Sequence, residues 1–295
     1  MTNSAAMRVG VVIATKGRPR LPALLVHELN GQTKPPDAII ISVSDPADAP
    51  TLRGQNVTIV HSAPGLTAQR NAGIDELGNS FDVVVFFDDD FFPSRYWIEN
   101  VCALFASAPG VACITGSAMA DGSKTAGLTW EKAGLLVERA DRAPKQPPGL
   151  VKEDFPPCGC NMAFRQSAIG ELKFDERLVL YAWQEDTDFG ARVAKRGRCV
   201  FSDALWGVHL GTKGGRTSGF RLGYSQIVNP RYLVAKGTMR PLRALELAGR
   251  NLIANIVRAA CPEPYIDRLG RLRGNLIGLH DIATGRWRPE RAAEL

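Results

Sequence analysis

The sequence has no long hydrophobic run. No apolar stretch reaches the roughly 18 to 20 residues that a helix needs to span a bilayer. The first residues, 1–8, do not place a positively charged segment before a long apolar one, as an export signal does. Both absences argue against an integral membrane protein and against export, so we expect a cytoplasmic protein.

Closely spaced cysteines are also scarce. Of the six cysteines, only Cys158 and Cys160 lie near each other, and a Cys-x-Cys pair lacks the spacing of a zinc knuckle. Disulfide frameworks are typical of small secreted domains. This chain has 295 residues, 45% of them hydrophobic, which is enough for a sizeable core. We therefore predict reduced thiols within one large or two small globular domains.

Charge is distributed unevenly. Residues 216–295 contain 14 Lys and Arg against 6 Asp and Glu, whereas residues 1–215 contain 22 against 24. A basic segment attracts nucleic acid, anionic lipid or phosphorylated substrates, although a modest surplus also serves solubility alone. No nucleic-acid-binding motif is recognisable, so we expect no nucleic acid partner.

Short apolar runs alternate with helical patterns over the first 117 residues. This alternation predicts an α/β fold, with a mostly parallel sheet wrapped by helices on both faces. Residues 121–157 are rich in Gly, Pro and charge, and we expect a surface excursion there with a hairpin around Leu135. A helix is predicted over residues 185–196 and a short strand over residues 199–202. The strands expected in the first part cover residues 8–14, 38–43, 56–61, 82–87 and 111–117, and the helices cover residues 21–30, 68–77 and 97–107.

Three consecutive acids end the most apolar of these runs. Residues 83–87 read Val-Val-Val-Phe-Phe, and Asp88, Asp89 and Asp90 follow. Adjacent carboxylates repel one another, so a fold keeps them together only where a cation, cationic side chains or water offset the charge. A solvated turn is the alternative. The aromatics and proline of residues 91–93 favour a metal and nucleotide site instead.

Polar side chains follow the other predicted strands as well. Ligands of open α/β sheets bind outside the C-terminal ends of the strands. Arginine suits a diphosphate, and aspartate suits ribose hydroxyls or a base N–H group. Their occurrence at four strand ends is the argument for a nucleotide site. The residues concerned are Thr15, Lys16, Arg18, Ser44, Asp45, Asp48, Gly65, Arg70 and Asn71.

A second acidic cluster begins the helix predicted after residue 184. Glu185 and Asp186 follow Tyr181 and Trp183. Acids at a helix N-terminus are favoured by the backbone dipole, so helix capping is one reading. The other is a general base that removes a proton from a hydroxyl while the aromatics stack on a sugar ring.

Taken together, these segments resemble glycosyltransferase family 2. The resemblance covers residues 8–216. It is carried by the order of Val12 to Arg18, Gln32 to Pro36, Ser42 to Asp45, Gly65 with Arg70 to Gly73, Asp88 to Asp90, Gly159 to Arg165, and Glu185 and Asp186 with Arg192 and Gly197. It implies a GT-A fold, a nucleotide-sugar donor, a carbohydrate or lipid-linked acceptor, and Mg²⁺ or Mn²⁺.

The resemblance also implies roles for individual residues. Asp186 matches the catalytic base, and Asp90 matches the metal ligand of the DxD motif, with His209 completing the metal site. Trp183 and Glu185 belong to the acceptor side. The nucleotide-sugar contacts implied are Thr15, Arg18, Asp45, Arg70, Asp88, Asp89 and Arg216.

The implied reaction is inverting transfer to a hydroxyl group. Arg216, with Lys213 nearby, is expected to contact the leaving phosphates from a mobile loop, although a flexible basic linker is the alternative reading. Ser44 and Pro46 flank a single acid where many relatives have two, so the donor stays open among UDP, dTDP and GDP sugars. Without the membrane helices of polysaccharide synthases, processive synthesis is not expected.

The last quarter of the chain is expected to be a basic, largely helical extension, residues 216–295. It follows a catalytic domain over residues 1–215, with a nucleotide-sugar half at 8–120 and an acceptor half at 121–215. A helix over residues 241–260 either packs on that domain or lies on an anionic membrane, at its inner face. The apolar side of this helix is formed by Leu242, Leu245, Leu252, Ile253 and Ile256.

Two rival functions stay open. A sugar-phosphate nucleotidyltransferase also uses a nucleotide fold with metal-binding acids, but it needs a glycine-rich phosphate loop that residues 17–22 do not supply. A non-catalytic nucleotide- or polyanion-binding protein fits the basic extension but leaves the acidic clusters unexplained.

Overall fold

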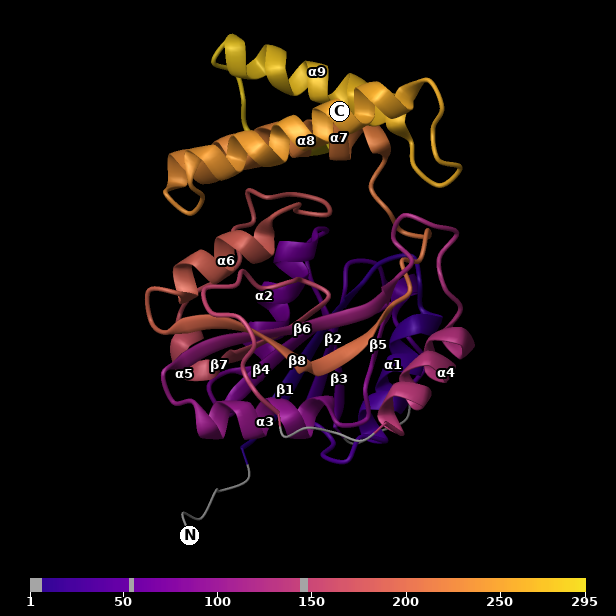
Figure 1. Cartoon of the computed structure of the whole chain (residues 1–295), viewed down its shortest axis with the longest axis vertical. Helices are drawn as coiled ribbons and strands as arrows, with labels where there is room; N and C mark the ends of the chain where they lie inside the picture. The colour runs from indigo at the N-terminus through magenta and orange to yellow at the C-terminus, as the bar shows by residue number, and fades with distance from the viewer. Residues whose placement is uncertain (1–6, 53–55, 144–147) are drawn as a thin grey trace.

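The alternation of strands and helices predicted for the N-terminal part is present in the computed structural model, which describes residues 7–52, 56–143 and 148–295 (Figure 1). Residues 1–6, on which the expected lack of an export signal partly depends, lie outside the described residues. The first elements are β1 (Val9–Thr15), α1 (Arg20–Asn30), β2 (Ala38–Val43), the 3₁₀ turn η1 (Pro46–Asp48), β3 (Val57–His61), α2 (Leu66–Leu77) and β4 (Val83–Asp88).

Eight strands of the described chain form one sheet, in the order β3-β2-β1-β4-β7-β6-β8-β5. The strands β3, β2, β1 and β4 are parallel neighbours. Beyond them β7 runs antiparallel to both β4 and β6, β6 and β8 are parallel, and β5 is antiparallel to β8. The expected α/β architecture is confirmed. The later strands are β5 (Phe91–Pro93), β6 (Val111–Asp121), β7 (Asn161–Arg165) and β8 (Arg198–His209).

Helices cover both faces of this sheet, because side chains alternate along each buried strand. Val11 of β1 packs with α1 and with α3 (Trp97–Ser107) on one face. Val12 packs with α2 and with α6 (Glu185–Val193) on the other, where the short α5 (Gln166–Ile169) also lies. All strand C-terminal ends of the parallel half therefore reach one edge of the sheet, where ligands are expected.

The segment expected as a surface excursion contains a helix, α4 (Trp130–Asp141), so the predicted hairpin around Leu135 is wrong. The Thr129 hydroxyl caps the helix by accepting the Lys132 N–H at 3.2 Å. Ala133 and Val137, one turn apart, are buried against strands β5 and β8. The exposed Leu135 and its half-exposed neighbour obscured this periodicity in the sequence. Residues 144–147 of the same segment lie outside the described residues.

One strand was not predicted, and another is longer than predicted. Residues 161–165, read only as the end of a glycine-containing turn, form β7 in the centre of the sheet. The short strand expected at 199–202 and the apolar run at 204–208 are one 12-residue strand, β8. Its pairing with β6 contains register shifts, which carry the strand past its polar residues.

The C-terminal part is helical, as predicted. Its helices are α7 (Gly219–Lys236), α8 (Pro241–Ala259), α9 (Arg268–Ala283) and the 3₁₀ helix η2 (Pro289–Ala293). They form a layer at the end of the molecule opposite α3 (Figure 1). A small core that includes Leu178, Ala182, Tyr232, Leu233 and Leu247 joins this layer to the catalytic part. None of the helices in the described ranges combines the length and hydrophobicity needed to cross a bilayer.

Candidate active site

The three consecutive acids lie in the tight turn between β4 and β5, and each has a different environment. Asp89 is fully buried, where it accepts the Thr15 hydroxyl at 2.6 Å and pairs with Arg18 at 2.9 Å. Burial raises the pKa of Asp89 to about 7, although Arg18 and Thr15 both favour its charged form. Asp89, Thr15 and Arg18 therefore bind one another and fix the rim formed by β1 and β4.

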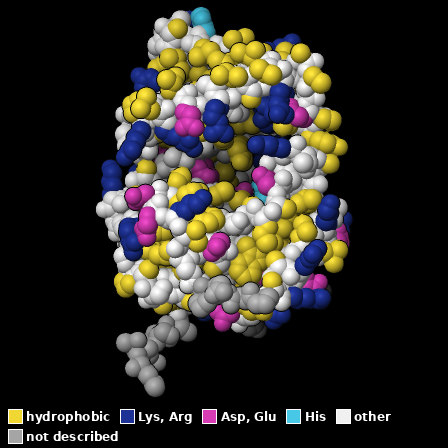
Figure 2. All heavy atoms as spheres, viewed as in Figure 1, with side chains coloured by type: hydrophobic (Ala, Val, Ile, Leu, Met, Phe, Trp, Pro, Cys, Tyr) yellow, Lys and Arg dark blue, Asp and Glu magenta, His cyan; other side chains and the backbone are white. Residues whose placement is uncertain are grey.

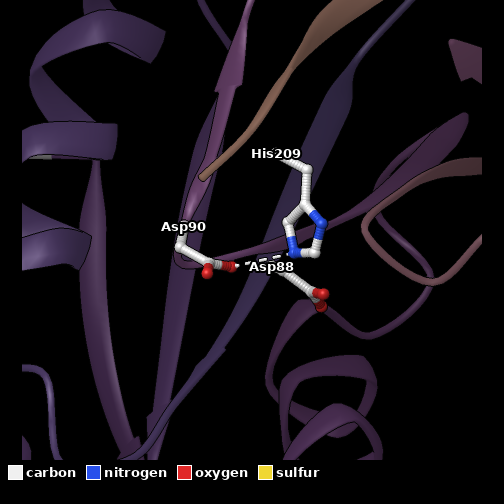
Figure 3. Close-up of side chains that lie close together, drawn as sticks. All are labelled: Asp88, Asp90 and His209. Atoms are coloured by element: carbon white, nitrogen blue, oxygen red, sulfur yellow. Dashed lines mark ion pairs between the residues drawn. The ribbon is translucent and has the colours of Figure 1, made fainter. Parts of the chain in front are cut away.

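Asp88, Asp90 and His209 form a group that can hold a metal ion. One potential ligand atom of each lies within 4.8 Å of the others. Figure 3 shows the Asp90 carboxylate directed at the imidazole, at 3.4 Å from Nε2, with Asp88 beside both. Oxygen ligands with one imidazole suit Mn²⁺ or Mg²⁺. Asp88, expected to contact the sugar or ribose, thus has a second possible role.

A fourth acid, Asp121, orients the histidine, and no motif in the sequence indicated this role. Asp121 Oδ1 lies 2.9 Å from His209 Nδ1, which leaves Nε2 facing Asp90. The two residues are partners in the β6–β8 ladder. Burial opposes the charged imidazolium, but contacts with Asp121 and Asp90 outweigh it and raise the pKa of His209 to about 10. A carboxylate on the second ring nitrogen is typical support for a metal-bound histidine, and a metal at Nε2 would displace the proton that the raised pKa keeps there.

Asp90 is held from the other side by the loop after β8. Its Oδ2 accepts the Thr212 N–H at 2.7 Å and lies 3.3 Å from Arg18. Burial disfavours the Asp90 carboxylate, but contacts with His209, Arg18 and Thr212 outweigh it and lower its pKa to about 2. Asp90 is therefore ionised, as a metal ligand must be.

A cavity of about 410 Å³ lies at the ends of the parallel strands, and Gly17 in its wall adjoins Arg18, which contacts Asp90. Its walls come from the loops after β1, β2, β3 and β8, and the predicted nucleotide residue Asp45 is among them. Asp45 is exposed, and its Oδ1 caps η1 by accepting the Ala47 N–H. Its second carboxylate oxygen stays available to a ligand. The lining residues are Lys16, Gly17, Ser44, Asp45, Asp48, Pro64 and Gly215.

Arg70 is the buried centre of the acidic site rather than an exposed side chain. Its guanidinium donates to Glu185 at 2.5 Å, to Asp88 at 3.2 Å and to the Gly159 carbonyl at 2.8 Å. Only 2% of its side chain is exposed. Glu185, expected on the acceptor side, is likewise buried, and burial raises its pKa to about 8 despite Arg70. The pair joins α2 to α6 and holds Asp88 in place.

Asp186 stands at the first turn of α6, and both of its oxygens accept backbone N–H groups. Gly159 donates to Oδ2 at 2.9 Å and Thr187 donates to Oδ1 at 2.7 Å. Burial raises the pKa of Asp186, while these two bonds oppose the rise. A side chain at position 159 would place its Cβ 2.9 Å from Glu185 Oε1, so only glycine fits between the two acids. Gly159 thus links Asp186 to the Arg70 centre.

The loop before α6 has an unusual backbone. Leu180, Ala182 and Gln184 adopt left-handed conformations, with φ of 63°, 52° and 75°. Such residues cost about 1 to 2 kcal/mol each and persist where surrounding contacts fix them. The α2 N-terminus bonds the Leu180 carbonyl, and Asn229 of α7 donates to the Trp183 carbonyl at 2.9 Å. Tyr181, between the strained residues, stays 54% exposed.

Arg216 lies in the loop between β8 and α7, and its guanidinium forms hydrogen bonds with nearby backbone carbonyls. It donates to the carbonyls of Gly211, Thr212 and Ser123. Lys213 donates to the carbonyls of Gly122 and Ser123. Neither cation has a carboxylate partner among its described hydrogen bonds, so both keep their charge available beside Asp90.

Comparison with known proteins assigns the chain to a family. The sequence profile described as glycosyl transferase family 2 matches residues 11–173, more than half of the chain. The chain belongs to this family. It is therefore a glycosyltransferase, and the predicted recognition is confirmed. No functionally curated protein gives a significant sequence match.

A solved mannosyltransferase structure shares the fold at low sequence identity. The mannosyltransferase PcManGT from Pyrobaculum calidifontis, in complex with GDP-Man and Mn²⁺, aligns with a TM-score of 0.52 and 15% identity, over 97% of this chain and 82% of that one. S. aureus TarS 1–349 aligns with a TM-score of 0.48 and 11% identity, over 95% of this chain and 92% of that one. The expected GT-A architecture is thereby confirmed.

Proposed function

We propose that this glycosyltransferase moves a sugar from a nucleoside-diphosphate donor to a hydroxyl acceptor, with inversion and with a divalent metal. The observation that carries the proposal is a single edge of the sheet at which three features meet. These are the Asp88, Asp90 and His209 group, the cavity beside Asp45, and the carboxylate of Asp186.

The cavity beside Asp45 is the proposed site of the nucleoside. Asp45 keeps one oxygen for a base N–H, and Asp48, which also lines the cavity, joins it. Thr15 and Arg18 both bind Asp89, and Arg18 also contacts Asp90 of the metal group. The base stays open among uracil, thymine and guanine. The neighbour bound to GDP-Man and Mn²⁺ makes GDP-mannose one donor to test.

Asp90 and His209, with Asp88 as third ligand, are the residues proposed to hold Mg²⁺ or Mn²⁺. A metal there neutralises charge on the leaving diphosphate. The chain's own contribution is to keep Asp90 ionised, to aim His209 through Asp121, and to place Lys213 and Arg216 near the phosphates.

Asp186 is the proposed general base. It accepts the proton of the acceptor hydroxyl, whose oxygen attacks the anomeric carbon as the bond to the diphosphate breaks, so that the nucleoside diphosphate leaves. Direct attack on the face opposite the leaving group inverts the anomeric centre. Tyr181 and Trp183 are proposed to contact the acceptor sugar. We assign Glu185 and Arg70 to positioning, because both are buried and bind each other.

The proposed division of the chain is a catalytic part, residues 1–215, and a helical extension, residues 216–295. The extension also supports the loop before α6, residues 180–184, here called the acceptor loop. Asn229 bonds the Trp183 carbonyl of this loop, and Lys236 pairs with both Asp175 and Asp188. We propose cell-surface polysaccharide or glycolipid synthesis in the cytoplasm as the setting, with a carbohydrate or lipid-linked acceptor.

Calorimetric binding of UDP, GDP and dTDP, each with and without Mn²⁺ or Mg²⁺, tests the proposal. We expect metal-dependent binding of one nucleoside diphosphate, lost in Asp90→Ala. Asp75→Ala is the matched control, because Asp75 is an exposed acid on α2 that does not belong to the metal group. Absence of binding by every nucleotide, with and without metal, would refute the assignment of this edge as a donor site.

A further inference from the structure

The helix α8 turns its apolar side outward. Five aliphatic side chains on one face of it are between 54% and 82% exposed. The side facing α7 and α9 instead carries amides, and Asn255 there is completely buried. This is the reverse of the usual arrangement, in which a surface helix buries its apolar stripe. The exposed residues are Leu242, Leu245, Ile253, Ile256 and Val257.

The interior between α7, α8 and α9 is correspondingly polar. Asn255 donates to Gln226 at 3.1 Å and to Asn275 at 2.8 Å, and Arg268 donates to the Asn255 side-chain oxygen at 3.1 Å. Asn275 in turn donates to the Gly223 carbonyl at 2.7 Å. Buried amides that bond one another across helices are a common means of holding helices together in lipid.

The contact between α7 and α9 is made through glycines. A Cβ added at Gly274 would lie 2.0 Å from the Phe220 carbonyl oxygen, and one at Gly223 would lie 2.1 Å from the Arg271 carbonyl oxygen. Close backbone approach at small residues is the second feature typical of helix packing in membranes. Meanwhile α9 exposes leucines of its own, which are Leu269, Leu276 and Leu279.

We propose that the exposed apolar sides of α8 and α9, here called the leucine face, rest in the interface of an anionic lipid bilayer. Arginines accompany this face. Arg243 and Arg250, seven residues apart, share one edge of α8, and both are exposed and pair with the exposed Glu246 between them. Residues 216–295 carry the basic surplus of the whole chain. Apolar side chains bordered by cations are what an interfacial helix on anionic lipid presents.

The position of the leucine face agrees with binding to a lipid bilayer. Figure 2 shows hydrophobic side chains gathered over the end of the molecule formed by the C-terminal helices, with a row of Lys and Arg between them and the catalytic part. A second copy of the chain fits less well, because a two-fold contact would set the arginine-bordered face against itself. Anionic lipid phosphates instead attract the net basic charge of residues 216–295.

Resting on the surface places the acceptor loop beside lipid. Trp183 is bonded to α7, and α7 packs against both helices of the leucine face. Together with the proposed function, on which this step rests, the geometry assigns a lipid-linked molecule as the acceptor class. Its apolar chain would stay in the bilayer while its sugar enters the site.

Flotation of the full chain with vesicles tests the leucine face. We expect binding to vesicles of phosphatidylglycerol and phosphatidylcholine and weak binding to phosphatidylcholine alone. The variant Leu242→Gln with Leu245→Gln should reduce the partition coefficient about tenfold or more, because it removes two of the most exposed aliphatic groups. The matched control is Leu135→Gln with Val151→Gln, two exposed aliphatic residues elsewhere, which should bind as the unmodified chain does.

Three results would overturn the proposal. The first is that the unmodified chain does not bind anionic vesicles. The second is that both double variants lose vesicle binding equally. The third is a dimer, seen by light scattering, that dissociates only when Leu242 and Leu245 are changed. Calorimetric nucleotide binding by the same variants separates this inference from the proposed function. A variant that loses vesicle binding but still binds nucleotide is altered in the leucine face alone. A chain that binds vesicles but no nucleotide refutes only the enzymatic assignment.

Discussion

At the scale of single residues, the acids of the site differ by what holds them. Asp89 and Glu185 are buried with arginine partners, whereas Asp186 accepts two backbone N–H groups and, at 3.4 Å, the Thr187 hydroxyl. A carboxylate held by the backbone keeps a fixed orientation without a permanent cationic partner. This distinguishes Asp186 from its neighbour Glu185 as the proton acceptor.

Asp186→Asn should lower the rate of sugar transfer about 10²- to 10⁴-fold, the usual loss when a general base is removed. Donor binding should be unchanged, because Asp186 lies outside both the metal group and the nucleoside cavity. Transfer kinetics and calorimetry on the same preparation measure the two effects. An active Asp186→Asn enzyme would assign the base to another residue, with Glu185 tested first.

The pH dependence of transfer should show the same carboxylate. Burial raises the pKa of Asp186, and the base acts only when ionised, so kcat/KM should fall as pH decreases through a value above the ordinary aspartate pKa of about 3.9. A pH–rate profile gives the midpoint. Residual transfer by Asp186→Asn should lack this acid limb, and a midpoint at or below 3.9 would contradict the environment described.

Arg70→Met should destabilise the fold by about 3 to 5 kcal/mol, because it leaves the buried Glu185 without its cation. Urea unfolding measures the loss. Adding Glu185→Gln should recover part of it, since the double variant carries no unpaired buried charge at this contact. Strictly additive losses in the double variant would mean that the two residues do not act as a pair.

At the scale of elements, one helix of the extension fixes the acceptor loop. Asn229 of α7 bonds the Trp183 carbonyl, in a loop with three left-handed residues. The loop therefore depends on a bond from more than 40 residues away. A strained segment keeps its shape only as long as such contacts persist.

Asn229→Ala should raise the acceptor KM about tenfold, because it leaves a buried carbonyl unsatisfied and releases the loop. Gln226→Ala is the matched control. Gln226 is a buried amide on the same helix, but it bonds Asn251, Asn255 and Asn275 instead of the loop. Both variants should lose stability, and only Asn229→Ala should change acceptor kinetics. Equal kinetic effects would mean that the bond from Asn229 to Trp183 has no specific effect on the loop.

Elements with strong local patterns were predictable from the sequence. The runs that form β1, β2 and β4 are continuous and apolar, and α3 was predicted with its observed bounds. Prediction failed where long-range contacts decide. β7 is short and begins with a polar residue, and only its position between β4 and β6 makes it a strand. In α4, two leucines on the exposed side disguised the buried pair Ala133 and Val137.

The same distinction applies to the site. Asp90 and His209 were predicted as partners through the family resemblance, and the structure brings them together with Asp88. Asp121 was missed, because its role follows from strand pairing with His209 across 88 residues. The burial of Arg70 and Glu185 was likewise not readable, since each residue is polar and the other is 115 positions away.

At the scale of the whole molecule, the catalytic part and the extension share a core. Leu178 and Ala182 pack with Tyr232 and Leu233 of α7, and Lys236 pairs with Asp175 and Asp188. Removal of the extension would expose these apolar groups and leave Asp188, which is fully buried, with one cation fewer.

A fragment of residues 1–215 should therefore fold poorly and lack transfer activity. We expect aggregation or a broad thermal transition in place of the cooperative one of the full chain, measured by circular dichroism and light scattering. A fragment ending after Lys236 and Met239, such as 1–240, is the informative comparison, because it retains α7. A soluble, active 1–215 fragment would show that the two parts are independent domains.

The pairing of β8 with β5 and β6 also fixes when the metal group can exist. The contacts of Asp90 are complete only after His209 and Thr212 have packed beside it. Thr212 lies 122 residues further along the chain. During synthesis, at about 5 to 20 residues per second, β1 to β4 emerge well before that strand. The newly made N-terminal half thus holds three adjacent acids without their histidine. At the proposed site, metal binding would become possible only late, so it would report completed assembly of the sheet and not its initiation.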